Sequence, residues 1–67
     1  MRRTRLARQM HAYRVACKAT QSEWARVCGV ESSTVSRWER GVSKPRPRLV
    51  AHCDYLYDAK WRPEVPQ

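Results

Sequence analysis

The sequence predicts a compact all-α domain of four helices, with at most a short fifth turn, and two observations lead to this prediction. Apolar residues recur at helical spacing, as in the series Leu6, Met10, Tyr13 and Cys17. No segment alternates apolar and polar residues over several positions, as a half-buried strand does. A chain of 67 residues allows one domain only. We divide it into a basic N-terminal arm (1–5), a helical domain (6–57) and a C-terminal tail (58–67).

The first two helices are predicted from their apolar faces and their end signals. The first helix runs from about Thr4 to about Lys18. Thr20 and Glu23 have the spacing of a capping box, in which each side chain accepts a hydrogen bond from the other residue's backbone N–H. Gly29 suits a left-handed C-terminal position. A short second helix is therefore expected over 21–28.

The last two helices follow from a glycine and two prolines. Gly41 ends a third helix, expected over 32–40. Pro45 and Pro47 exclude a helix across the following loop, and Pro47 suits the first turn of a fourth helix. Leu49, Cys53 and Leu56 supply the apolar stripe of that helix, which is expected to end near Tyr57.

The composition favours an anionic partner. The formal net charge is +8, and eleven of the fourteen basic residues are arginine. Nucleic acid is the commonest polymer that such a charge attracts. No apolar run is long enough to span a membrane and no signal sequence is recognisable, so we expect a cytoplasmic protein. The odd number of cysteines argues against a disulfide framework, and their thiols are expected to be reduced.

The third helix has two distinct faces. At about 100° per residue, Val35 and Trp38 lie on one side and bind the helix to the core. The opposite side carries short polar side chains and two arginines, with no bulky group to hold it away from a surface. It could enter a DNA major groove, where arginine binds guanine through two acceptors. A solvated polar face is the alternative, and the helix alone does not decide between them. The residues of this outward face are Ser32, Ser33, Ser36, Arg37 and Arg40.

The segment TQSEWARVCGVESSTVSRWERGVSKP (20–45) resembles the helix-turn-helix of phage repressor and Cro proteins, the Xre/Cro-like family. The resemblance covers about residues 6–57 and implies a lambda-repressor-like fold. It depends on several residues at the spacing of the family, none of which is specific by itself. These residues are Gln21, Ala25, Gly29, Val35, Glu39 and Gly41.

The resemblance implies roles for matched positions. In this family the second helix of the motif is the recognition helix, and its N-terminal half meets base edges. The implied base contacts are Ser32, Ser33, Ser36 and Arg37. The implied phosphate contacts are Gln21, Arg40, Ser43, Lys44, Arg46 and Arg48. Family members also pair the glutamate at position 39 with an arginine of the first helix, which is Arg14 here, as a structural ion pair.

The chain departs from the family pattern at several positions. Glu31 stands where the family usually has a capping Ser or Thr, so Ser32 is expected to cap the third helix and to shift its start by one residue. Lys18 replaces a usual glycine, and Trp24 replaces a commoner leucine. No counterpart of the fifth helix of many relatives is expected within these 67 residues. Trp61 either packs back over the core or takes part in a dimer contact.

The sequence therefore predicts a transcriptional regulator, specifically a repressor of phage or mobile-element type. It is expected to bind a two-fold-symmetric operator in double-stranded DNA as a weak homodimer that is completed on the DNA. The arginines of the N-terminal arm either touch the DNA backbone or minor groove or remain solvated. No membrane partner, small-molecule ligand or cofactor is expected.

Other function classes are weighed against this prediction. The cysteines and histidines lack metal-ligand spacing, and no residues are arranged for catalysis, so neither a metal site nor an enzyme is expected. Two alternatives remain open. One is an antitoxin-like or anti-regulator module that binds protein, which an exposed apolar patch at Leu56, Tyr57 and Trp61 would favour. The other is an excisionase-like architectural factor that bends DNA.

Overall fold

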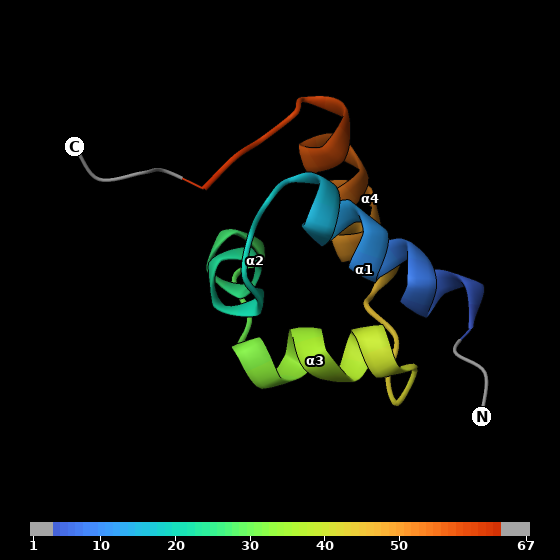
Figure 1. Ribbon diagram of the computed structural model, residues 1–67. Coiled ribbons are helices and arrows are strands. Elements are labelled where there is room, and N and C mark those ends of the chain that lie inside the picture. Colours follow the sequence, from blue (N-terminus) through green and yellow to red (C-terminus); the bar gives the residue numbers. More distant parts are fainter. Residues whose placement is uncertain (1–3, 64–67) are drawn as a thin grey trace.

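The computed structural model describes residues 4–63 and confirms the all-α fold class. The described part of the chain contains four helices and no strand. Helices α1 and α3 lie across each other with α2 at one side, and α4 packs against α1 (Figure 1). Arg2 and Arg3 of the expected arm, and residues 64–67 of the tail, lie outside the described residues. The helices are α1 (Arg5–Ala16), α2 (Gln21–Cys28), α3 (Ser32–Arg40) and α4 (Pro47–Asp58).

The first two helices begin at side-chain caps. The Thr4 hydroxyl accepts a hydrogen bond from the Ala7 N–H at 3.1 Å. Thr20 and Glu23 form the expected capping box, with the Glu23 N–H donating to the Thr20 hydroxyl at 3.1 Å and the Thr20 N–H donating to the Glu23 carboxylate at 2.8 Å. These bonds satisfy donors that the first turn of a helix leaves free.

Helix α3 has no such cap, and the expected shift of its start is wrong. The helix begins at Ser32, and Glu31 takes the N-cap position with extended backbone angles and no side-chain hydrogen bond. The start is instead held by the backbone, since the N–H groups of Thr34 and Val35 both donate to the Glu31 carbonyl.

All four helices end in the same way. Within the two residues that follow each helix, one residue has a positive φ. These residues are Lys18 (58°), Gly29 (75°), Gly41 (79°) and Lys60 (56°). The next residue then donates its N–H back to a carbonyl five residues earlier, as Ala19 does to Arg14 at 3.2 Å. This is the Schellman arrangement, which favours glycine because a Cβ crowds the left-handed conformation.

Replacing Lys18 with glycine is expected to stabilise the fold. Lys18 holds a positive φ of 58° that a side chain disfavours, so glycine should raise the free energy of unfolding by roughly 0.5–1 kcal/mol. Chemical denaturation of the two proteins measures the difference. Ala12→Gly, in the middle of the same helix, is the control and should lower stability by about 1 kcal/mol. A loss of stability in both variants would contradict the expectation.

The core is built around Trp24, which is fully buried, with Met10, Val35 and two cysteines beside it. Trp61 packs edge-on against Trp24, with ring centroids 5.9 Å apart. The structure therefore agrees with the first of the two expectations for Trp61, in which its side chain packs over the core. The Schellman turn at Lys60 directs the chain toward this position. In residues 4–63, no helix combines the length and apolar character needed to cross a membrane.

Candidate nucleic-acid interface

Helix α3 separates its polar and apolar residues as the sequence predicts. Val35 and Trp38 are buried in the core. On the opposite side Ser32, Ser33 and Arg37 are exposed, and Ser36 is half-buried. Arg40 follows on this side and is also exposed. The outward face thus carries all the residues that the resemblance implies as base contacts.

A buried carboxylate holds α3 against α1 and α2. Glu39 is 3% exposed, and the Arg14 guanidinium donates to both of its oxygens, at 2.6 and 3.1 Å. His11 Nδ1 lies 3.1 Å from Glu39 Oε1. Arg14 also donates to the Ala19 carbonyl at 2.9 Å, which ties the turn after α1 into the same network. The two members of the expected ion pair are therefore in contact, and the network extends beyond them.

Sequence reasoning missed His11 in this network. His11 lies three residues before Arg14 on α1, and residues at this spacing share one side of a helix. This spacing was the available signal, but a polar residue on a predicted helix is equally compatible with a position exposed to solvent.

Gln21 belongs to the same network, which changes how its role is understood. Its side-chain amide donates to Glu39 Oε1 at 3.2 Å, so it is directed toward the buried carboxylate. The capping box occupies the N–H groups of Thr20 and Glu23, whereas Gln21 contributes its own N–H at the first turn of α2. A phosphate contact by Gln21 can use this backbone N–H, which lies at the positive end of the helix dipole, or the second N–H of its side-chain amide.

Stability is expected to fall in acid through Glu39. Burial raises the pKa of this carboxyl, but hydrogen bonds from Arg14, His11 and Gln21 outweigh burial, so the pKa is lowered overall. The folded state thus binds this proton more weakly than the unfolded chain does. The contribution of Glu39 is complete above the unfolded-chain pKa of about 4.3 and is lost as the pH falls through the folded-state pKa.

Thermal melts between pH 7 and pH 3 measure this dependence. Glu39→Gln should be less stable at pH 7 and should lose less stability on acidification than the wild type. Glu31→Gln removes an exposed carboxylate and is the matched control, with the wild-type pH profile expected. A wild-type profile for Glu39→Gln would contradict the role of this carboxyl.

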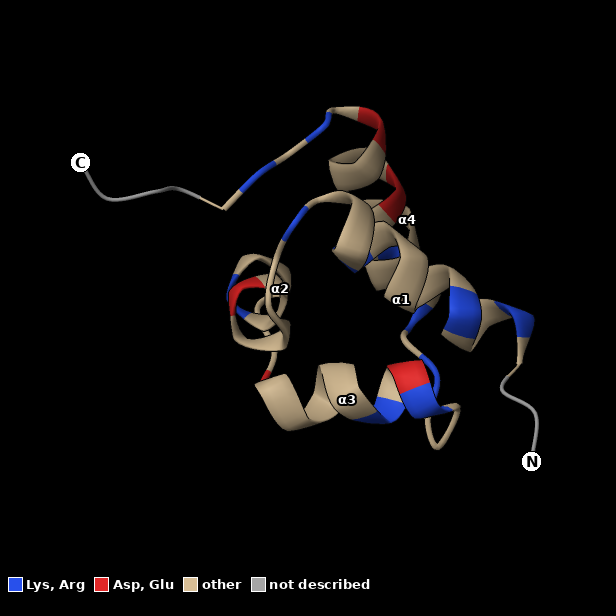
Figure 2. Ribbon diagram, in the orientation of Figure 1, with Lys and Arg blue, Asp and Glu red and all other residues tan. Residues whose placement is uncertain are grey.

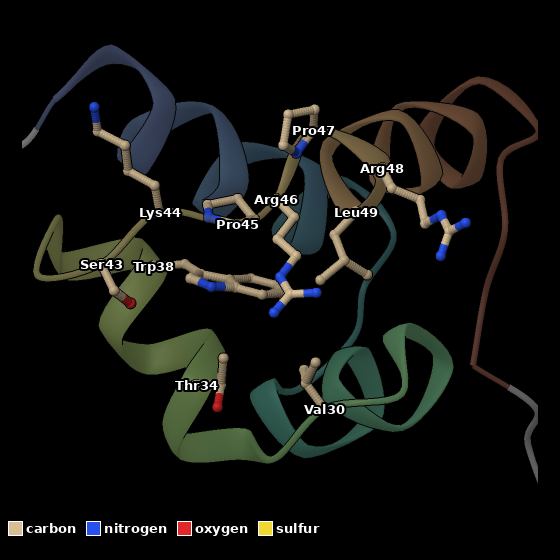
Figure 3. Close-up of a pocket in the computed structure, with 10 residues that line it drawn as sticks. All are labelled: Val30, Thr34, Trp38, Ser43, Lys44, Pro45, Arg46, Pro47, Arg48 and Leu49. Atoms are coloured by element: carbon tan, nitrogen blue, oxygen red, sulfur yellow. The ribbon is translucent and has the colours of Figure 1, made fainter.

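A cationic groove lies between α3 and the start of α4. Its volume is about 710 Å³, and its ten lining residues include three cations and no acid. Figure 3 shows the Trp38 ring at its centre, with the Arg46 side chain extending beside it. Four of the six implied phosphate contacts line this groove. The lining residues are Val30, Thr34, Trp38, Ser43, Lys44, Pro45, Arg46, Pro47, Arg48 and Leu49.

The groove also shows what the sequence did not indicate. Thr34 and Trp38 come from α3, whereas the cations come from the loop and from α4. Only the tertiary structure shows that one surface joins α3 to the cationic loop.

The charges of the molecule are unevenly distributed. Figure 2 shows basic residues on the first half of α1 and at the end of α3, and acidic residues on the second half of α4. The start of α1 lies close to the end of α3, because a Cβ placed on Gly41 would be 3.8 Å from the Thr4 backbone nitrogen. Arg5 and Arg8 therefore add positive charge beside Arg37 and Arg40. Within residues 4–63, no three His, Cys, Asp or Glu side chains are grouped as a metal site would require.

The comparison with protein families agrees with this geometry. The family described as a helix-turn-helix domain matches residues 5–66. No match is found among curated proteins or among solved structures. The matched segment contains α2, the Gly29 turn and α3, which are the two helices and the turn of the motif. The chain therefore belongs to the helix-turn-helix family of DNA-binding domains, of the Xre/Cro-like type.

Proposed function

We propose that this protein is a sequence-specific transcriptional repressor of phage or mobile-element type, with α3 in the major groove of its operator. The observation that carries the proposal is that α3 presents an exposed polar face with Arg37 and Arg40, while a groove with three cations lies along the same helix, bordered by Thr34 and Trp38. A short helix with small polar side chains can approach base edges, while cations beside it bind the phosphates that border the groove.

The residues divide into two groups under this proposal. Arg37 is the main determinant of sequence, through two hydrogen bonds to a guanine, and Ser32, Ser33 and Ser36 contact neighbouring base edges. Phosphate contacts position the helix and supply affinity without reading sequence. This second group consists of Arg40, Ser43, Lys44, Arg46 and Arg48, together with the backbone of Gln21.

Two copies are proposed to bind one operator. A single α3 contacts only a few base pairs, and one domain of this size buries too little surface for tight specific binding. Two copies related by a two-fold axis would read two half-sites about one helical turn apart. We propose that two copies associate weakly in solution and form the full dimer only when both are bound to the operator.

Selection from a pool of random duplexes tests the proposal. The wild-type protein should enrich a two-fold-symmetric site, and Arg37→Ala should enrich the same site with relaxed preference at one base pair of each half. The discrimination lost at that base pair should be about 1–3 kcal/mol. Arg26→Ala, an exposed arginine on α2, is the control and should select the wild-type site.

Binding without enrichment, equal for the wild type and Arg37→Ala, would contradict the proposal. Enrichment of an asymmetric site would retain sequence reading and contradict the two-fold mode. Strong bending of the selected duplex in a circular-permutation assay would favour the architectural alternative over the repressor.

The alternative of a protein-binding module loses its main support. That reading required an exposed apolar patch at Leu56, Tyr57 and Trp61. Leu56 is buried and Trp61 packs against Trp24, so only Tyr57, which is 46% exposed while it stacks on Tyr13, remains of that patch.

A further inference from the structure

Two cysteines from different helices meet in the core. Cys28 is the last residue of α2 and Cys53 lies in the middle of α4, and their sulfur atoms are 3.8 Å apart. Both thiols are free. The third cysteine, Cys17, is also buried, but its thiol is directed to the Leu56 carbonyl at 4.0 Å. The chain therefore contains one close pair of thiols and, within the same fold, a third thiol for comparison.

A second observation concerns the indole of Trp24. This side chain is fully buried, and its Nε1–H has no hydrogen-bond partner among residues 4–63. A buried donor without an acceptor is costly, so such a group is worth explaining. Trp24 also lies near enough to Cys53 to favour the charged form of its thiol. A thiolate at Cys53 would thus give this donor an anionic acceptor.

The two thiols differ in their tendency to ionise. The hydrogen bond from Cys28 lowers the pKa of Cys53, with a further contribution from Trp24, although burial opposes the shift. The same bond and burial raise the pKa of Cys28. Burial also raises the pKa of Cys17. Either sulfur can donate to the other across 3.8 Å, so the pair can share one proton and leave the other sulfur as a thiolate.

We propose that Cys28 and Cys53 form a redox-reactive dithiol, which a hydroperoxide oxidises to a disulfide between the end of α2 and the middle of α4. The inference does not depend on the proposed repressor function, because it concerns only the two sulfurs and their surroundings.

The reaction balances in two steps. The thiolate of one cysteine attacks one peroxide oxygen, so an S–O bond forms, the O–O bond breaks, and the leaving oxygen takes a proton as water or alcohol. The sulfur of the other cysteine then attacks the oxidised sulfur, which forms the S–S bond and breaks the S–O bond. The released hydroxide takes the proton of this second thiol and leaves as water. Two thiols are oxidised by two electrons, and one hydroperoxide is reduced.

The structure allows the sulfurs to approach. They must move from 3.8 Å to about 2 Å apart. Cys28 is the terminal residue of its helix and precedes Gly29, where the chain leaves α2. It is also 7% exposed, whereas Cys53 is fully buried, so a small oxidant would reach the pair on the Cys28 side.

The disulfide would close a loop that contains the whole of α3 and the loop that lines the cationic groove. Cross-linking residues 28 and 53 restricts the unfolded chain and should raise the melting temperature by about 10 °C or more. The modification would therefore stabilise the part of the fold that carries the interface.

The test uses the full-length reduced protein with a small excess of hydrogen peroxide. The free thiols, counted after denaturation, should fall from three to one, and the mass should fall by the two hydrogens lost. Trypsin places each cysteine in a different peptide. Cys17 lies in peptide 15–18, Cys28 in peptide 27–37 and Cys53 in peptide 49–60. The peptides containing Cys28 and Cys53 should appear linked, and the Cys17 peptide should remain free.

Variants and a melting curve complete the test. Cys17→Ala should still form the disulfide and show the rise in melting temperature, and Cys28→Ala should show neither. Peptide mapping of the wild type gives the answer even where a variant folds poorly. Three surviving thiols, a disulfide that includes Cys17, or covalent dimers in place of the internal link would each overturn the proposal.

Discussion

Replacing Arg14 with alanine is expected to lower the free energy of unfolding by about 3–5 kcal/mol, the range for removing one partner of a buried ion pair. Arg14 donates to both oxygens of Glu39, which is 3% exposed. The substitution removes the guanidinium that neutralises this carboxylate in the core, and His11 and Gln21, which also contact it, do not replace that charge-assisted pair. A loss of this size is a large part of the stability of a small domain.

Denaturation of the wild type and three variants measures this effect. Arg8→Ala removes an exposed arginine from the same helix and should change stability by less than about 0.5 kcal/mol. The double variant Arg14→Met/Glu39→Leu should be more stable than Arg14→Ala, because it removes both charges from the core. An unchanged melting temperature for Arg14→Ala would show that the pair does not hold α1 and α3 together.

The second large expected effect is a steep dependence of DNA binding on salt. The proposed phosphate contacts include four cations: Arg40, Lys44, Arg46 and Arg48. Neutralising about four phosphates gives a slope near −3.6 in log K against log salt, so affinity should fall on the order of a hundredfold between 50 and 200 mM salt for each bound domain. Fluorescence anisotropy with a labelled duplex measures the slope.

Single substitutions test whether the cations of the groove cause the salt dependence of DNA binding. Lys44→Ala and Arg46→Ala should each reduce its magnitude by about 1, with little change in the sequence selected. Arg26 does not line the groove, so Arg26→Ala should retain the wild-type slope. Equal slopes for all four proteins would place the phosphate contacts elsewhere.

Local signals in the sequence predicted most of the secondary structure. The capping box at Thr20 and Glu23, the turn glycines Gly29 and Gly41, and Pro47 each act within a few residues, so they are readable without the fold. The cap of α3 was the exception, although the helix has the expected bounds of 32–40. Glu31 is a poor cap, yet it occupies the N-cap position, because the turn at Gly29 and the burial of Val35 position the helix irrespective of its cap.

The helical periodicity of the chain and its helix-ending residues determined the fold class, and the resemblance of residues 20–45 indicated the helix-turn-helix family. They also determined which face of α3 is polar, because helical periodicity is a local property. The tertiary structure alone decided which distant residues share a site. It directed Gln21 and His11 to Glu39, joined Trp38 to the cations of the following loop, and brought Cys28 within 3.8 Å of Cys53. These contacts depend on how the helices pack against one another. The same polar residues at the same spacing are compatible with a buried network and with a solvated surface, so the sequence alone does not distinguish the two.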